Sequence, residues 1–111
     1  MNLDFKDVDG KLIIAMVGEL DHHSSDEVRN KIDDYIRFKG YKNVILDFSG
    51  VTFMDSSGIG VVIGRYKKLN SSGGTICIVN ARESVKRVFE LSGMLKIINI
   101  YSSVDEAARS I

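Results

Sequence analysis

Residues 43–70 read NVILDFSGVTFMDSSGIGVVIGRYKKLN and hold the pattern that decides the fold. The short apolar run Asn43–Phe48 predicts a buried strand. A turn through Asp55–Gly58 follows, and apolar residues three and four apart then predict a helix that ends near Asn70. A buried strand that leads into a helix is the repeating unit of an α/β fold.

The N-terminal third predicts a hairpin and a helix. Asp9-Gly10 is a type I′ turn signal between two apolar segments. The second segment, residues 12–17, is apolar without interruption, which favours burial on both faces. Ser24 and Glu27 then form a capping-box pattern at the start of a helix that Gly40 should end.

The C-terminal third predicts two more strands, at residues 75–79 and around 97–100, and two more helices. The predicted helix caps are Asn80 with Glu83, and Ser103 with Glu106. The expected order is ββαβαβαβα, an α/β domain with a mostly parallel mixed sheet, an N-terminal hairpin and covering helices.

The composition suits one small cytoplasmic domain. Of 111 residues, 44% are apolar, enough for one modest core, so we expect a single domain over residues 1–111. The 15 basic and 15 acidic residues balance, which argues against general nucleic-acid binding. The start MNLDFKDVDGK does not resemble a signal peptide, and no apolar run could span a membrane. We therefore expect a cytoplasmic protein without membrane contact.

The turn Asp55-Ser56-Ser57-Gly58 is the main candidate site, because function in α/β sheets gathers where a strand's carboxyl end meets the next helix. Asp55 or Ser56 can cap the helix, which leaves Ser57 in the first turn with its hydroxyl near the surface. Taken alone, such a turn is more often only a cap.

The helix after this turn carries a second signal. Its core stripe is expected at Ile59, Val62, Ile63, Tyr66 and Leu69. A second face, reached by steps of three and four from Ser57, holds Gly60, Val61, Gly64, Arg65 and Lys68. Each glycine inside a helix costs about 1 kcal/mol relative to alanine, so another surface should approach this face closely. The basic side chains favour a partner protein over packing within the domain.

Other kinds of site fit less well. The glycines of residues 58–64 depart from the G-x-G-x-x-G spacing, and the next strand lacks the acid that binds a ribose. A serine hydrolase has a glycine two residues before its nucleophile, and neither serine of the turn has one there. His22 and His23 should diverge into solvent, and Cys77 should be a small buried side chain. We expect no metal and no cofactor.

Two segments resemble a known family: GELDHH at residues 18–23 and FMDSSGIGVVIGRYK at residues 53–67. They are similar to the anti-sigma factor antagonists of the STAS domain family, of the stage II sporulation protein AA type. Similarity in VKRVF at 85–89 and SGMLKII at 92–98 extends this resemblance along nearly the whole chain. It implies one STAS domain over residues 1–111.

The resemblance implies a regulator and not an enzyme. The unphosphorylated protein, a monomer when free, would bind an anti-sigma factor that is itself a serine kinase, and so free the sigma factor. Phosphorylation of Ser57, the second serine of the family's DSSG motif, would end this binding, and a serine phosphatase would restore it. The acid of the family's GELD motif maps onto Asp21, near the docking surface. The expected partner-binding residues are Asp21, Asp55, Ser56, Gly58, Gly60, Val61, Gly64 and Arg65.

Two alternatives remain open at this stage. One is a nucleotide-binding α/β domain that uses the DSSGIG turn. The other is a constitutive interaction module whose serine is only a helix cap. The programme under control, sporulation or stress, is also open.

Overall fold

In the computed structural model, which describes residues 1–111, a hairpin forms one edge of the sheet. Strands β1 (Asn2–Val8) and β2 (Lys11–Leu20) pair antiparallel. The turn residues Asp9 and Gly10 have φ of 53° and 81°. Positive φ at both central positions defines a type I′ turn, so this prediction is confirmed.

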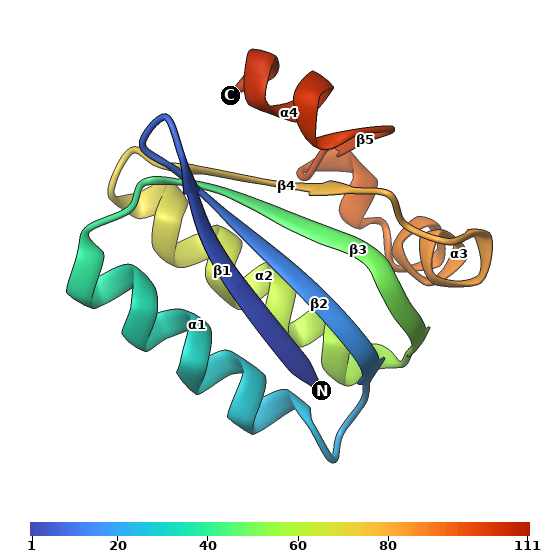
Figure 1. The fold of residues 1–111 in the computed structure, drawn as a ribbon. Helices are drawn as coiled ribbons and strands as arrows, with labels where there is room; N and C mark the ends of the chain where they lie inside the picture. Colours follow the sequence, from blue (N-terminus) through green and yellow to red (C-terminus); the bar gives the residue numbers. More distant parts are fainter.

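The other strands add to β2 in parallel, and the sheet has the order β1-β2-β3-β4-β5 (Figure 1). They are β3 (Asn43–Met54), β4 (Thr75–Val79) and β5 (Ile100–Tyr101). The helices are α1 (Ser25–Lys39), α2 (Ser56–Ser71), α3 (Glu83–Ser92) and α4 (Val104–Ser110), with a 3₁₀ turn at Met94–Lys96. The predicted ββαβαβαβα order and the mostly parallel mixed sheet are confirmed.

The two faces of the sheet are covered differently. Helices α1, α2 and α3 pack on one face over the main core, in which Phe48 and Phe89 meet edge to face. On the other face α4 covers β3 to β5 and encloses a small cluster with Ile13 and Cys77. Val17 on β2 stays 54% exposed. Burial of residues 12–17 on both faces was therefore wrong at Val17, because α4 does not extend that far.

Strand β3 runs six residues beyond the predicted Phe48 and ends at Met54, directly before the candidate turn. Its register against β2 shifts twice, between Ala15 and Val17 and again after Gly18. Gly50 fits this irregular region because a Cβ there would lie 2.7 Å from the Met16 carbonyl oxygen. The longer strand carries the chain to the same edge of the sheet as the end of β2.

The predicted helix caps are confirmed in part. The Ser103 hydroxyl accepts the Glu106 N–H at 3.1 Å, and Gly40 ends α1 in the left-handed conformation. The capping box at Ser24 was wrong, because its side chain makes no cap hydrogen bond. Asn80 was also wrong: it has φ of 59° and lies outside α3. The last strand is shorter than expected and starts at Ile100.

Candidate functional site

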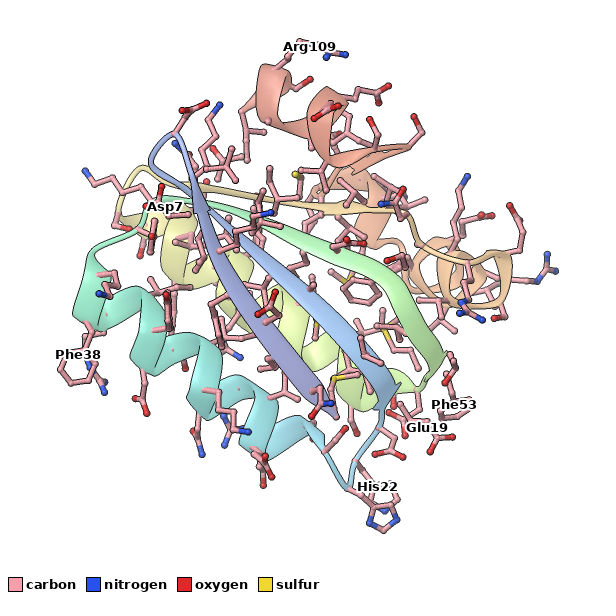
Figure 2. The ribbon with its side chains drawn as sticks, in the orientation of Figure 1. Asp7, Glu19, His22, Phe38, Phe53 and Arg109 are labelled. Atoms are coloured by element: carbon pink, nitrogen blue, oxygen red, sulfur yellow. The ribbon has the colours of Figure 1, made fainter.

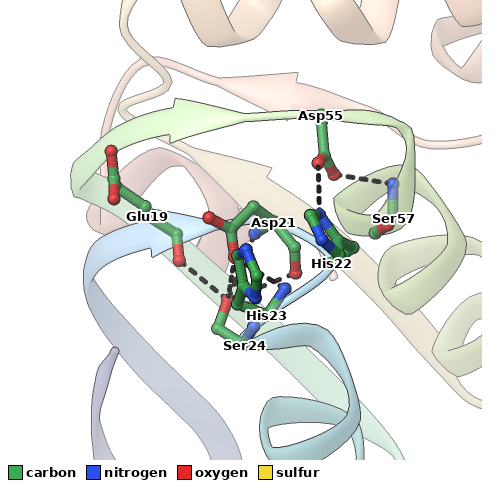
Figure 3. A network of polar contacts seen from close by, with 7 residues as sticks. All are labelled: Glu19, Asp21, His22, His23, Ser24, Asp55 and Ser57. Carbon is green, nitrogen blue, oxygen red and sulfur yellow. Dashed lines mark hydrogen bonds and ion pairs between the residues drawn. The ribbon is translucent and has the colours of Figure 1, made fainter.

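The candidate site lies where β2 and β3 end side by side. Leu20 and Met54, the last residues of the two strands, are register partners. The Asp55 N–H donates to the Leu20 carbonyl at 3.3 Å, so the two following loops begin in contact. Residues 21–24 after β2 therefore meet the start of α2, as Figure 3 shows.

Asp55 is the N-cap of α2. Its backbone is extended, and its Oδ1 accepts the Ser57 N–H at 2.8 Å. This contact satisfies one of the free N–H groups at the helix start. Ser56 is exposed and Ser57 is half-buried. Of the two predicted capping residues the structure selects Asp55, and the Ser57 hydroxyl is not needed as a cap.

Asp21 organises the loop after β2. Its Oδ1 accepts the N–H groups of His23 at 3.0 Å and of Ser24 at 3.1 Å. The Ser24 hydroxyl reaches back to the Glu19 carbonyl at 2.8 Å, which closes the loop. Partial desolvation raises the pKa of Asp21, but the hydrogen bonds from Ser24 and His23 and the nearby imidazole outweigh it and hold the pKa below its usual value.

His22 joins the two loops, which the sequence did not predict. The rings of His22 and His23 lie 3.9 Å apart between centroids, so the expectation that they diverge was wrong. The tight turn at Asp21 brings them together. His22 Nδ1 lies 3.9 Å from Oδ2 of Asp55 while the side chain stays 70% exposed.

Phe53 is a second residue that the sequence reasoning missed. It is 49% exposed and pairs in register with the exposed Glu19. Glu19, His22 and Phe53 lie at one end of the molecule (Figure 2). The signal available in the sequence was alternation, since Phe53 precedes the buried Met54 and must point the other way.

The expected outer face of α2 was wrong at Val61 and Arg65, and Gly58, expected to bind the partner, is not at the surface either. Gly58, Val61 and Arg65 are buried, and the buried residues of α2 are Gly58, Val61, Val62, Arg65 and Leu69. The predicted core positions Ile59, Val62, Ile63, Tyr66 and Leu69 all belong to the core or pack against it, so the buried side of α2 is wider than predicted. A Cβ at Gly58 would lie 2.3 Å from Cγ of Met54, so this glycine permits close packing inside the domain.

Arg65 is buried because it faces α1. Only 4% of its surface is exposed, and its Nε lies 2.8 Å from Oδ1 of Asp33, out of line for a hydrogen bond. Lys68 lies 2.8 Å from the other oxygen of Asp33. Burial lowers the pKa of Arg65, and Asp33 opposes this change. The two basic residues thus join α1 to α2; Arg65 is removed from the surface, and the exposed Lys68 is already paired with Asp33.

Gly60 and Gly64 behave differently from Gly58. Gly60 is exposed, Gly64 is half-buried, and a Cβ at either would meet no atom within 4 Å. The domain itself therefore does not make the close approach that these glycines predicted. Both positions leave the backbone of α2 open on the side next to the Ser57 turn.

The turn is poorly suited to hold a nucleotide phosphate. The Ser57 N–H at the start of α2 is already bound by the Asp55 carboxylate, which would also repel an anion. No group of three or more His, Cys, Asp or Glu side chains is arranged to hold a metal ion. None of the helices is both long and apolar enough to cross a membrane. Cys77 is buried as predicted, and burial raises the pKa of its thiol to about 12.

Comparison with known proteins defines the class to which this fold and site belong. Residues 2–107 match the STAS domain, and the chain belongs to this family. A Paenibacillus polymyxa protein named anti-sigma F factor antagonist is 42% identical over 94 residues, which cover 85% of this chain and 80% of that protein.

Solved structures agree with this assignment. A Thermotoga maritima protein matches with a TM-score of 0.94 and 30% identity, over 98% of this chain and 93% of that one. The anti-sigma factor antagonist SpoIIAA in its unphosphorylated form matches with a TM-score of 0.75 and 28% identity, over 98% and 96% of the two chains. Its phosphorylated form matches with the same TM-score and 29% identity, over 99% and 100%. The resemblance found in the sequence is confirmed.

Proposed function

We propose that this chain is an anti-sigma factor antagonist that a serine kinase switches off by phosphorylating Ser57. One observation carries the proposal: Asp55 caps α2, so the Ser57 hydroxyl is not used as a cap and is available for modification. The names of the similar proteins support the same class. The cap formed by Asp55 supports the proposal over the reading in which the serine is only a cap, because the Ser57 hydroxyl is not needed for that role.

The docking surface of this proposal is the exposed region around the turn. We define it by Asp21, Phe53, Asp55, Ser56, Ser57, Gly60 and Gly64. Phe53 is a half-exposed aromatic ring of the kind that often anchors a protein interface. The open backbone at Gly60 and Gly64 would let a partner element approach α2 closely. Gly58, Val61 and Arg65 support this surface from beneath.

A phosphate on Ser57 would change binding without unfolding the domain. It adds about −1.5 to −2 charges, and in the first helical turn this charge meets a favourable dipole of about 0.3 to 1 kcal/mol. Inside an interface the same group would suffer exclusion, desolvation and repulsion from Asp55 of several kcal/mol. Since 1.4 kcal/mol changes affinity about tenfold, release of the partner is the dominant effect.

The partners follow from this mechanism. The chain is a substrate of the anti-sigma factor kinase and not an enzyme, and a serine phosphatase would return it to the binding form. We expect it to act in the cytoplasm as a monomer when free, without nucleic acid, membrane, metal or cofactor. This chain and the sigma factor then compete for the anti-sigma factor, and the outcome controls how much sigma factor is free for transcription.

The proposal is tested by incubating the protein with its candidate anti-sigma factor and ATP and locating the phosphate by peptide mass spectrometry. We expect one phosphate on Ser57 in the wild type and none in Ser57→Ala. Ser56→Ala is the matched control and should be phosphorylated normally. Binding of the anti-sigma factor by Ser57→Ala should survive the addition of ATP. Phosphate on Ser56 alone would refute the acceptor assignment.

A further inference from the structure

The corner around Ser57 is acidic, and the basic groups near it are two histidines and the N-terminal amine of Met1, which lies against Gly18 of β2 and interacts with Glu27 of α1. Glu19, Asp21 and Asp55 contribute carboxylates from the end of β2, its loop and the cap of α2. Every lysine or arginine ion pair lies on α1 or between α1 and α2, and none includes these three acids. These ion pairs therefore leave the three acids of the corner without a lysine or arginine partner.

His22 is the histidine that faces the Ser57 turn. Its Nδ1 lies 3.9 Å from Oδ2 of Asp55, while Oδ1 of the same carboxylate accepts the Ser57 N–H at 2.8 Å. Figure 3 shows both contacts meeting at the Asp55 side chain. Ser57 and His22 thus lie on the two sides of one carboxyl group.

The other charged groups of the corner leave His22 free to turn. Oδ1 of Asp21 is occupied by the N–H groups of His23 and Ser24. The His23 ring lies against that of His22 at a tilt of 38° and interacts electrostatically with Asp21. His22 makes its only ion-pair contact with Asp55, at a long distance and with most of its surface in solvent.

Building on the proposed function, we propose that His22 is the counter-ion of phosphorylated Ser57 and that its protonated imidazole moves from Asp55 to the phosphate. A phosphoryl group on Ser57 would add three acceptor oxygens at the helix start, where His22 and the Ser57 N–H both face the Asp55 carboxylate. The positive charge of the imidazole partly offsets the repulsion between the phosphate and the carboxylates of Glu19, Asp21 and Asp55. The ion pair keeps the phosphorylated form ordered at the docking surface and makes its charge depend on pH near neutrality.

The sign of the pH effect follows from the pair. A protonated imidazole stabilises the doubly charged phosphate, so the phosphate loses its second proton at a lower pH than in free phosphoserine, for which this occurs near about pH 6. Conversely, the phosphate holds the proton on His22 to a higher pH. For an exposed pair we expect each titration midpoint to move by about half a pH unit.

The test uses full-length protein with phosphoserine incorporated at position 57 during translation, so that no kinase is needed. The ³¹P resonance is titrated in the wild type, in His22→Gln and in the matched control His23→Gln. We expect the phosphate midpoint to rise by about half a pH unit in His22→Gln and to stay within about 0.1 in His23→Gln. The difference should shrink in 1 M salt, where exposed pairs are screened within about 3 Å.

A second readout needs no histidine variant. The ring-proton resonances of His22 should titrate at higher pH in the phosphorylated protein than in the unphosphorylated one, and those of His23 should change less. An unchanged phosphate midpoint in His22→Gln, or an equal change in His23→Gln, would overturn the inference. Failure of the anti-sigma factor to phosphorylate Ser57 would instead contradict the proposed function and leave these titrations interpretable.

Discussion

The first turn of α2 and its middle differ in solvent exposure and in the contacts that their side chains make. At the start, Asp55 and Ser57 are half-buried, and the Asp55 carboxylate accepts the Ser57 N–H. Two turns later, Arg65 is buried and held by Asp33 of α1. One helix thus carries a changeable surface at its beginning and a fixed attachment further along. This separation explains how a modification could alter binding while the fold beneath it persists.

The largest expected effect tests the fixed attachment. Arg65→Ala removes the buried partner of Asp33 and leaves that carboxylate with Lys68 alone. Removing one member of a buried ion pair is strongly destabilising, so we expect the free energy of unfolding to fall by about 3 kcal/mol. Urea unfolding measures this, with the exposed Lys67→Ala as control at less than about 0.5 kcal/mol. Equal stabilities of the two variants would show that the α1–α2 contact is not an anchor.

The next effect tests the helix start. Asp55→Ala removes the side chain that accepts the Ser57 N–H, and loss of an N-cap costs about 1 kcal/mol. The neighbouring Ser56→Ala, which removes an exposed non-capping side chain, serves as the matched control and should change stability by less than about 0.5 kcal/mol. A larger loss in Ser56→Ala than in Asp55→Ala would contradict the assignment of the cap.

Local sequence signals predicted the elements but not their mutual orientation. The Asp9-Gly10 turn, the bounds of β4 and the start of α2 depend on neighbouring residues and were predicted correctly. Arg65 is buried beside Asp33, which lies far away along the chain, and periodicity alone placed Arg65 on the outer face. A basic residue reads as exposed unless its buried partner is known.

The candidate site likewise has parts that local sequence predicts and parts that depend on the fold. Asp55 and Ser57 could be placed at a helix start because capping is local. The contact between His22 and Asp55 could not, since it depends on β2 and β3 ending in register at Leu20 and Met54. Exposure of Phe53 likewise depends on how far β3 extends.

A smaller effect distinguishes the glycines of α2. Gly60→Ala adds a methyl group to open space and a better helix former, so we expect the free energy of unfolding to rise by about 0.5 to 1 kcal/mol. Gly58→Ala should instead lower it, because Met54 and Leu20 occupy that space. Under the proposed function Gly60→Ala should also weaken anti-sigma factor binding, which calorimetry can measure. A stabilised variant with unchanged affinity would remove Gly60 from the docking surface.

The smallest effect is a pH dependence in the loop beside the turn. The lowered pKa of Asp21 means that its stabilising contribution is present above the unfolded value of 3.8 and is lost as pH falls through the folded value. In Asp21→Asn the amide oxygen can still accept the two N–H groups but does not titrate. The stability difference between wild type and variant should therefore shrink between about pH 5 and pH 2, measured by urea unfolding at several pH values. A constant difference would contradict a role for the Asp21 charge.

The proposed effect of phosphorylation on Ser57 is a changed surface on a domain that stays folded. Its most direct test compares protein carrying phosphoserine at position 57 with unmodified protein, measuring anti-sigma factor affinity by calorimetry and Tm by thermal unfolding. We predict an affinity loss of about a hundredfold or more, with Tm unchanged within about 2 °C. Equal affinities, or an affinity loss that accompanies a collapse of Tm, would contradict the account.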